Sequence, residues 1–454
     1  MTFLQFFGGV GEIGGNKILL VDGDVKIWLD FGQSFKMGED YFTGWLQPRS
    51  QNGLGDYFEF DLLPKLKGLY AKHMLEGTPL IYDEPRFHAV FISHAHFDHV
   101  NHISFLDPMI PVYCGSGTKL FLEASEEAGF GTDYGAHDYR TFRTGVEIEL
   151  DGLRVKPIHV DHSIPASYGF IVETSSGAVI YTGDLRAHGP KHEMTEEFIS
   201  AATMAEPIAL ISEGTRMVSI EGCKNFSEDE VFKGVREILD RIEGSDLSLF
   251  YTHNSRDTDR FSTFYNAAEC YGRSLVIPPR FAYLLNKLVK DEHLHLPDPL
   301  SDDLILVYYR RKKSGKYFET DYYEWERLFW EKKITADEIR RHPFKYMMDL
   351  GFYNFTELID IRPKPGSPFI YSMSEPFDEG DIEDRVMHNW LDHFGLEYTQ
   401  LHASGHMSKN ELKEAILRIN PEAVYPIHTE NPELFRRFHD KVIIPNKGRR
   451  YALR

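Results

Sequence analysis

The sequence predicts an α/β protein, and two observations support this fold class. Short apolar runs end in histidine, aspartate, glutamate or glycine, as in HAVFISHAH, AVIYTGD and IALISEGT. Such runs are typical of buried strands whose ends carry reactive side chains at one edge of a sheet. Helical patterns interrupt these strands at 228–243 and at 259–271.

A change of character along the chain predicts that one domain is inserted into another. With 454 residues, the chain is too long for one ordinary core. From about 217 to 396, aromatic and charged residues alternate densely and no metal-ligand cluster occurs, whereas strand-plus-histidine segments resume afterwards. We therefore expect a first domain formed by 1–216 and 397–454, and an inserted domain formed by 217–396.

Composition excludes several classes of protein. Hydrophobic residues make up 42% and charged residues 26%, which is typical of a globular chain. No run approaches the ~18 apolar residues of a membrane span, and the N-terminus lacks the features of a secretion signal. The cysteines Cys114, Cys223 and Cys270 are widely spaced and form no C-x-x-C pair, which favours a reducing compartment. We expect a cytoplasmic protein without a membrane partner.

The net charge argues against a nucleic-acid ligand. It is −20, from 50 basic and 70 acidic residues, whereas proteins that bind nucleic acid usually present a basic face. Carboxylates that surround bound cations account for part of this acidity. Positive charge also clusters at 310–316 and at 447–454, although each run is more typical of a solvated surface.

The first thirty residues predict three strands. Residues 3–7 lead into a glycine-rich turn, and 17–21 and 25–29 flank an Asp-Gly pair, which is typical of a hairpin. The segment 34–88 that follows matches no pattern. It either gates a cleft or covers the sheet.

The string SHAHFDH predicts a metal site. It follows the apolar strand 89–92 and places three imidazoles and a carboxylate within six residues. In a turn that leaves a strand, His94 and His96 can point to one metal, while Asp98 and His99 on the next bend point to another. Imidazole and carboxylate suit Zn²⁺, with Mn²⁺ or Fe²⁺ as alternatives, and the absence of cysteine ligands argues against a structural zinc finger.

Three more ligand candidates end later apolar strands: His162 in DHSIP, Asp184 in TGD and His428 in PIH. Three protein ligands for each metal and a bridging carboxylate leave one coordination position open for water, which is typical of a catalytic site. We expect two metals that share Asp184, one bound by His94, His96 and His162, and the other by Asp98, His99 and His428.

These motifs resemble a known family. HAHFDH resembles the signature of the metallo-β-lactamase superfamily, and Glu213 in SEGT, His406 in ASGH and His428 in PIHTE resemble the three additional motifs of the β-CASP nucleases. Within that group the match is to ribonuclease J-like enzymes, through GGVGEIG, LDFG, HSIP, ASGH and PIHTE. The resemblance spans residues 8 to about 430 and is looser in the insertion.

The resemblance implies a metallo-β-lactamase αββα sandwich with an inserted α/β β-CASP domain. It implies a two-metal ribonuclease whose substrate is single-stranded RNA, with a 5′-monophosphate. It also implies that Asp30, in LDFG, orients a metal ligand, the alternative being that Asp30 only caps a turn. Bacterial ribonuclease J proteins usually carry a further C-terminal domain, and this sequence stops soon after its last metal motif. Whether the protein forms a homodimer, and whether it acts as a 5′ exonuclease or an endonuclease, are therefore left open.

The motifs also suggest roles in catalysis. Two cations lower the pKa of a shared water and neutralise charge on a phosphodiester. The leaving 3′ oxygen then needs a proton, and our candidate acid is His406, kept protonated by Glu213. We count Asp98, Asp184, Glu213 and His406 as the catalytic residues.

A capping box, SKNE, predicts a helix from Lys409 to Ile419 directly after this histidine. Free N–H groups at a helix N-terminus bind anions. We therefore expect a substrate phosphate to lie against Ser404, Gly405, His406 and Ser408, as the resemblance also implies.

We expect the insertion to select the substrate. Aromatic residues beside the basic run are candidates for stacking on unpaired bases, although such residues more often belong to a core. Arg256 and Asp257 are weaker candidates for a place at the domain cleft. The aromatic candidates are Tyr308, Tyr309, Tyr322 and Trp325.

Three rival functions share part of this evidence. A DNA nuclease of the same superfamily would carry every motif quoted. A small-molecule metallo-hydrolase would use the metal site without needing Glu213, His406 or the large insertion. A metal-stabilised binding protein without activity is the third, and the intact ligand set argues against it.

Overall fold

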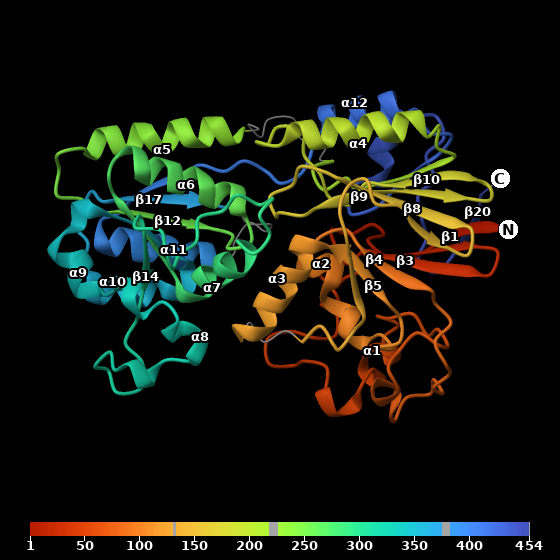
Figure 1. Cartoon of the computed structure of the whole chain (residues 1–454), viewed down its shortest axis with the longest axis horizontal. Coiled ribbons are helices and arrows are strands. Elements are labelled where there is room, and N and C mark those ends of the chain that lie inside the picture. Colours follow the sequence, from red (N-terminus) through yellow and green to blue (C-terminus); the bar gives the residue numbers. More distant parts are fainter. Residues whose placement is uncertain (130–132, 218–225, 375–381, 454) are drawn as a thin grey trace.

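A computed structural model describes residues 1–129, 133–217, 226–374 and 382–453. Its strands form three sheets, two stacked on one side of the molecule and the third on the other (Figure 1). Cys223 lies outside the described residues, and Cys114 and Cys270 form no disulfide. Within those ranges, no helix combines the length and the apolar character needed to cross a membrane.

The first sheet contains the strands on both sides of the predicted metal motif. The hairpin predicted at its start forms, and the strand predicted at 89–92 is found with those bounds. The four strands from β3 to β6 are parallel, and the others are antiparallel. In spatial order the strands are β20 (Arg450–Ala452), β1 (Thr2–Gly8), β2 (Lys17–Asp22), β3 (Val25–Phe31), β4 (Ala89–Ile92), β5 (Val112–Gly115) and β6 (Tyr139–Phe142).

The second sheet packs face to face on the first. Its strands are, in spatial order, β19 (Val424–Pro426), β11 (Ala209–Ser212), β10 (Gly177–Tyr181), β9 (Tyr168–Thr174), β8 (Leu153–His159) and β7 (Ile148–Leu150). Apolar side chains from both sheets form one core between them, with Leu29 and Phe91 meeting Phe170 and Ile211. Such interdigitation of inner faces is what joins two sheets into a sandwich.

Helices cover the outer faces of this sandwich. α4 (His192–Met204) and α12 (Lys409–Ile419) pack on the second sheet, while α2 (Phe97–Val100) and α3 (Ser116–Glu127) lie beside the first (Figure 1). The result is the predicted αββα sandwich. Segment 34–88, which includes α1 (Gly55–Glu59), buries Leu54, Phe58 and Leu69 in the core beneath the first sheet, so it covers that sheet.

The third sheet is parallel throughout. Its spatial order is β15 (Lys333–Ile334), β14 (Ile305–Tyr308), β13 (Ser274–Ile277), β16 (Tyr346–Asp349), β12 (Leu249–His253), β17 (Pro368–Ser372) and β18 (Glu397–Gln400). All these strands come from one continuous stretch between β11 and β19. We propose that this stretch is the inserted domain, and that it extends beyond the boundary expected at 396, since β18 pairs with β17.

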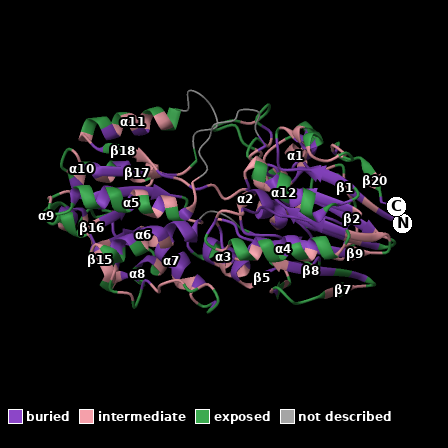
Figure 2. Ribbon diagram, turned by 90° about the horizontal axis from the view of Figure 1, so that it is seen from above, coloured by how far each residue is buried: buried purple, intermediate pink, exposed green. Residues whose placement is uncertain are grey.

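Helices cover both faces of the third sheet. One face packs against α5 (Glu228–Ile242), α6 (Thr258–Cys270) and α7 (Pro279–Leu288), and α8 (Glu324–Arg327) contacts α7. The other face packs against α9 (Ala336–Arg341), α10 (Leu358–Ile361) and α11 (Ile382–Phe394). Figure 2 shows buried strands between helices whose outward faces are exposed. α5 and α6 begin and end within one residue of the predicted helices.

Three of the four aromatic candidates for base stacking belong to the core instead, which is the more usual place for such residues. Tyr308, Tyr309 and Tyr322 are buried and belong to the core, because their rings pack against neighbouring apolar and aromatic side chains. Trp325 is half-buried and its ring lies 5.9 Å from that of Tyr283. Part of the basic run beside them is neutralised by ion pairs, Arg311 with Asp360 and Lys312 with Glu326.

Candidate metal centre

The predicted metal ligands all lie at strand ends on one edge of the sandwich. His94 and His96 follow β4, and Asp98 and His99 lie in the first turn of α2. His162 follows β8, Asp184 follows β10 and His428 follows β19. The second and first sheets therefore bring side chains from 94 to 428 to one place, as expected for loops at the end of a sheet.

The first group of ligand atoms belongs to His94, His96, His162 and Asp184. One atom from each lies within 4.8 Å of the other three. The Nδ1 atom of His96 is 3.0 Å from Nε2 of His94 and 3.1 Å from Nε2 of His162. Three ring nitrogens thus point to one spot, which is how imidazoles surround a cation.

The second group belongs to Asp98, His99, Asp184 and His428, again within 4.8 Å of one another. Nε2 of His428 is 2.9 Å from Oδ2 of Asp98, and Nε2 of His99 is 3.1 Å from Oδ2 of Asp184. The other carboxylate oxygen of Asp184, Oδ1, is buried and has no hydrogen-bond partner among the described residues. A buried acceptor of this kind is costly unless a cation or water binds it.

Hydrogen bonds on the far side of the rings fix which nitrogen carries the proton. Nδ1 of His162 lies 2.6 Å from the carbonyl oxygen of Gly405, and Nδ1 of His99 lies 2.7 Å from Oδ2 of Asp30. Because both of these partners only accept, each Nδ1–H donates, which leaves the lone pair of Nε2 directed at the centre.

Electrostatics favour a cation at this position. Burial lowers the pKa of His94 and His162 well below the usual value and that of His96 to about 3, so these rings are neutral. Burial also acts on Asp98, but His99 and His428 outweigh it and hold the pKa of this carboxyl at about 2. At the second group burial is opposed by the nearby carboxylates, chiefly Asp184, which raise the pKa of His99 well above its usual value and that of His428 to about 8. A metal at this group would displace a proton from each of these two rings, and the donors would then be neutral imidazoles and ionised carboxylates, the forms that bind a divalent metal.

Asp30 occupies a β-bulge beneath the centre. Lys17 pairs with Phe31 and the next residue along, Ile18, pairs with Leu29, so Asp30 is the extra residue, and its φ is +58°. Besides its contact with His99, its carboxylate accepts hydrogen bonds from the backbone N–H and the hydroxyl of Ser93, both at 2.7 Å. The bulge therefore directs this side chain toward the metal motif.

Two glycines allow the backbone to approach Asp98. A Cβ atom on Gly14, whose φ is +78°, would lie 2.5 Å from Oδ2 of Asp98, and one on Gly32 would lie 1.8 Å from its carbonyl oxygen. Any side chain at either position would displace Asp98. The GGVGEIG and LDFG motifs thus pack directly on this residue.

His406 and Glu213 lie beside the centre. Nδ1 of His406 is 3.5 Å from Oε2 of Glu213 and 4.0 Å from Oδ2 of Asp184. Glu213 is buried, and its Oε2 accepts a hydrogen bond from the N–H of Thr215. The side chain of His406 is 20% exposed, whereas those of the buried ligands around it are nearly inaccessible.

The loop around His406 leads directly into α12. This helix has the predicted bounds, and the predicted capping box forms: the hydroxyl of Ser408 accepts from the N–H of Glu411, whose carboxylate accepts from the N–H of Ser408. The hydroxyl of Ser404 accepts from the N–H of His406 at 3.2 Å. A Cβ atom on Gly405 would lie 2.9 Å from the ring of His162, so this loop packs against a candidate ligand.

Three supporting residues were missed from the sequence. Thr215 lies 2.8 Å from Nδ1 of His428, and the hydroxyl of Tyr181 donates to Asp30. Nε2 of His188 lies 3.0 Å from the carbonyl oxygen of Ser404. Thr215 and Tyr181 are each within three residues of a motif residue, which is the signal that could have identified them.

The insertion reaches this centre through Arg256. This residue follows β12, and its guanidinium donates a hydrogen bond of 3.1 Å to the carbonyl oxygen of Ala95, between His94 and His96. The carboxyl end of at least this central strand of the third sheet therefore faces the metal motif. Ligands of open parallel sheets bind beyond that end.

Comparison with known proteins agrees with the motifs. Residues 60–222 match the family model described as "Beta-lactamase superfamily domain". Ribonuclease J of Sinorhizobium meliloti is 24% identical over 76% of this chain and 58% of its own length, and that of Thermus thermophilus is 24% identical over 77% and 59%. Ribonuclease J of Helicobacter pylori is 22% identical over 93% of this chain and 55% of its own length.

A solved structure shows the same fold. It is a protein of unknown function from Enterococcus faecalis V583, with a TM-score of 0.78 and 24% sequence identity over 99% of both chains. The chain spans less than 60% of the length of the ribonuclease J proteins named above. The comparisons confirm the resemblance to the metallo-β-lactamase superfamily and to ribonuclease J that the motifs indicate.

Proposed function

We propose that this chain, which carries a beta-lactamase superfamily domain and is similar to ribonuclease J, is a metal-dependent hydrolase that cleaves phosphodiester bonds in RNA. One observation carries the proposal: two groups of candidate ligand atoms share Asp184, and the half-buried imidazole of His406 lies beside them. That arrangement combines a two-metal site with a proton donor. Neither a structural zinc site nor a simple binding module needs both.

We propose two Zn²⁺ ions as the cofactors, with Mn²⁺ or Fe²⁺ as alternatives. His94, His96 and His162 would hold one ion, and the other would be held by Asp98, His99 and His428, with Asp184 shared between them. When bound, the ions supply an activated water and neutralise charge on the phosphodiester. Asp30 keeps the ring of His99 in the correct tautomer.

His406 supplies the proton for the leaving oxygen. Its imidazole is 20% exposed, and its Nδ1 lies 3.5 Å from Oε2 of Glu213. A proton moves from His406 to the 3′ oxygen as the bond to phosphorus breaks. Glu213 is oriented for this role by the N–H of Thr215.

The loop before α12 holds the substrate phosphate. The N-terminus of an eleven-residue helix attracts an anion, and Ser404, Gly405, His406 and Ser408 surround that end. The hydroxyl of Ser408 accepts from the helix backbone and retains its proton as a donor.

The substrate that we propose is single-stranded RNA with a 5′-monophosphate. The protein would act as a 5′ exonuclease, an endonuclease or both, in RNA processing or decay in the cytoplasm. The similar proteins are named ribonuclease J, which is the support for RNA over DNA. A homodimer is the assembly that we would test first.

A small phosphodiester is the second candidate substrate. The net charge of −20 and the ion-paired basic run, which weaken the electrostatic attraction of a long polyanion, both favour it. A DNA nuclease is the third candidate, since its motifs would be the same.

One experiment separates these candidates. The purified protein is incubated with 5′-monophosphorylated RNA, the matched DNA and bis(p-nitrophenyl) phosphate, with and without chelator, and then with each metal restored. We expect metal-dependent cleavage of RNA in preference to DNA. Cleavage of the small ester alone would show that the substrate is a small phosphodiester and not RNA. If the metal-loaded protein hydrolysed none of the three, the proposal would be refuted.

A further inference from the structure

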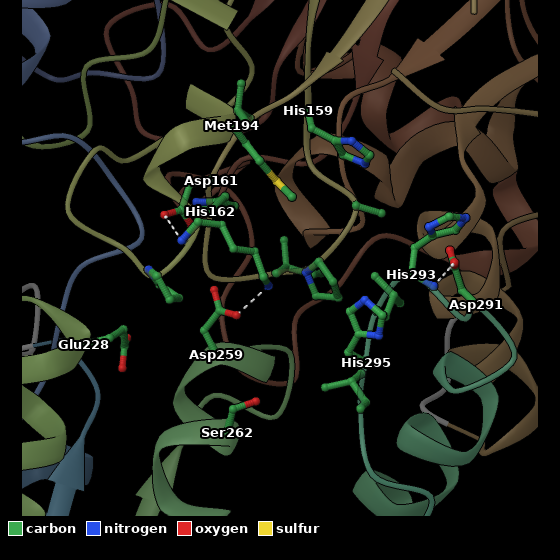
Figure 3. Close-up of a pocket in the computed structure, with 18 of the residues that line it drawn as sticks. His159, Asp161, His162, Met194, Glu228, Asp259, Ser262, Asp291, His293 and His295 are labelled. Carbon is green, nitrogen blue, oxygen red and sulfur yellow. Dashed lines mark hydrogen bonds and ion pairs between the residues drawn. The ribbon is translucent and has the colours of Figure 1, made fainter. Parts of the chain in front are cut away.

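A buried cluster of charged side chains joins the insertion to the metal domain. It lies along a cavity of about 940 Å³ that residues of both regions line. Figure 3 shows that Asp161 and His162 approach this cavity from the metal domain, and that Glu228 and Asp259 approach it from helices of the insertion. We call the following residues the interdomain ion cluster: Asp161, Arg186, Lys191, Glu228, Asp257, Asp259 and Arg260.

Arg186 is the link between the two regions. Its side chain is 0% exposed. Its Nε donates to Oδ1 of Asp161 at 3.0 Å, and one terminal nitrogen donates to Oδ2 of Asp259 in α6 at 2.5 Å. The other terminal nitrogen is 3.6 Å from Oε1 of Glu228 at the start of α5. One guanidinium thus contacts a loop of the metal domain and two helices of the insertion.

Arg260 extends the cluster to the loop of His406. It is also fully buried, and its guanidinium donates to both carboxylate oxygens of Glu228, at 3.0 and 2.8 Å. The same group donates at 3.1 Å to the carbonyl oxygen of Ala403, which immediately precedes Ser404. α6 of the insertion therefore holds the backbone of this loop directly.

The contacts fall next to the proposed ligands rather than at random along the interface. Asp161 adjoins His162 in the chain, and the backbone N–H of Arg186, two residues after Asp184, donates to the carbonyl oxygen of Asp161 at 2.8 Å. The space is tight as well: a Cβ atom on Gly189 would lie 2.1 Å from Nε of Arg186 and 2.4 Å from Oδ2 of Asp161. The side chains therefore have little freedom to move.

The charges nearly balance within the cluster. Three cations (Arg186, Lys191 and Arg260) face four carboxylates (Asp161, Glu228, Asp257 and Asp259). Burying such pairs adds little net stability over apolar packing, but removal of one partner is costly. Such a cluster fixes the relative positions of the loops and helices that it joins more than it stabilises the fold, because bidentate arginine contacts are directional.

We propose that Arg186 and Arg260 are positioning residues, through which the insertion fixes the loops of His162, Asp184 and His406 relative to one another. This inference rests on the proposed function, because it treats the first two as metal ligands. It implies that the insertion contributes to metal binding although it supplies none of the proposed ligands.

The test compares two arginines that each bridge the regions. Arg186→Met removes the link described above. Arg143→Met is the matched control, since Arg143 pairs with Asp291 of the insertion at 2.6 Å and its side chain forms no hydrogen bond with the described residues of the ligand loops. Zn²⁺ affinity is measured at equilibrium against a competing chelator. We expect a loss of about 10- to 100-fold for Arg186→Met, and a change within about 2-fold for Arg143→Met.

A second variant keeps the test valid if Arg186→Met fails to fold. Asp259→Asn preserves size and lies in the insertion, yet it should weaken Zn²⁺ binding by about 3- to 10-fold, because its only described contacts with the metal domain are Arg186 and Lys191. Arg186→Lys keeps the positive charge but cannot contact Asp161 and Asp259 at the same time as a guanidinium does. Its Zn²⁺ affinity should therefore lie between those of Arg186→Met and the unaltered protein.

The outcomes separate this inference from the proposed function. If the unaltered protein binds no Zn²⁺, Mn²⁺ or Fe²⁺, the proposed function fails. If it binds metal, but Arg186→Met and Asp259→Asn lower only the melting temperature and leave affinity as in Arg143→Met, the positioning role is overturned and the cluster is purely structural. Weakened binding in both variants, with Arg143→Met unaffected, supports it.

Discussion

The metal domain and the insertion treat buried cations in opposite ways. In the metal domain, Lys17 is buried and its ammonium group donates to the carbonyl oxygens of Gly15 and Gly32, and burial lowers its pKa to about 7. In the insertion, Arg260 is buried against carboxylates, chiefly Glu228, which outweigh burial and raise its pKa.

This difference shows what each region can offer to a substrate or a metal. The metal domain places imidazoles and carboxylates around one point. The insertion brings the permanent positive charge of Arg260 close to the loop of His406 but pairs it with Glu228 of the same region. We infer that one side binds cations and the other side orients the loops that do so.

The largest expected effect is on the shared carboxylate. Asp184→Asn should remove most bound metal and lower phosphodiesterase activity by about 1,000-fold or more, because both ligand groups lose their common oxygen. Elemental analysis and initial rates measure this change. Full metal content in this variant would contradict a shared site.

His406→Ala should lower kcat by about 100- to 10,000-fold while metal content stays intact, because this side chain gives a proton and holds no ion. The experiment combines rates with elemental analysis, and Glu213→Gln serves as its companion with a smaller loss. Loss of metal together with activity would make His406 a ligand instead.

A smaller effect is expected for the residue beneath the centre. Asp30→Asn should weaken metal affinity or activity by about 10- to 100-fold, because the amide cannot accept from His99 as strongly as a carboxylate. Chelator competition measures the affinity. A variant with unchanged affinity and rate would reduce Asp30 to a turn residue.

The smallest effect concerns Lys17 and the pH dependence of stability. In the unfolded chain its pKa is near 10.5, and in the native protein it is about 7. Between these values the unfolded state binds the extra proton, so this group makes the free energy of unfolding rise with pH, by at most about 1.4 kcal/mol per unit.

Lys17→Met should flatten that slope, whereas Arg260→Lys, which keeps a paired cation in the insertion, should leave it nearly unchanged. Urea unfolding at pH 7 and pH 9.5 gives both slopes. Identical slopes for the Lys17→Met variant and the unaltered protein would show that the lysine stays protonated in the native protein, and the contrast between the two regions would disappear.

Much of the metal centre could be predicted from the sequence because its signals are local. SHAHFDH places four side chains within six residues, and the capping box at Ser408 specifies where α12 begins. Strand ends in a two-layer fold come together at one edge, so His162, Asp184 and His428 could be joined to the motif from their positions alone. Their proposed ligand roles still await the metal measurements above.

The insertion was harder to predict because its information is long-range. The contact between Arg186 and Asp259 joins residues 73 positions apart, and no local pattern distinguishes these residues from other charged ones. The periodicity of the aromatic residues could not tell a stacking surface from a core, and Tyr309 and Tyr322 belong to the core. Strand β18 lies past the expected boundary, since pairing rather than composition defines the sheet.

The place of His428 in the chain has a consequence for how the protein is made. Its ring meets Asp98 across 330 residues, and β19, which precedes it, and β20, which follows it, each occupy the edge of a sheet. During synthesis from the N-terminus, the HAHFDH segment emerges long before its last partner. A nascent chain would thus expose an incomplete set of carboxylates and imidazoles until His428 has left the ribosome, and tight metal loading should follow that point.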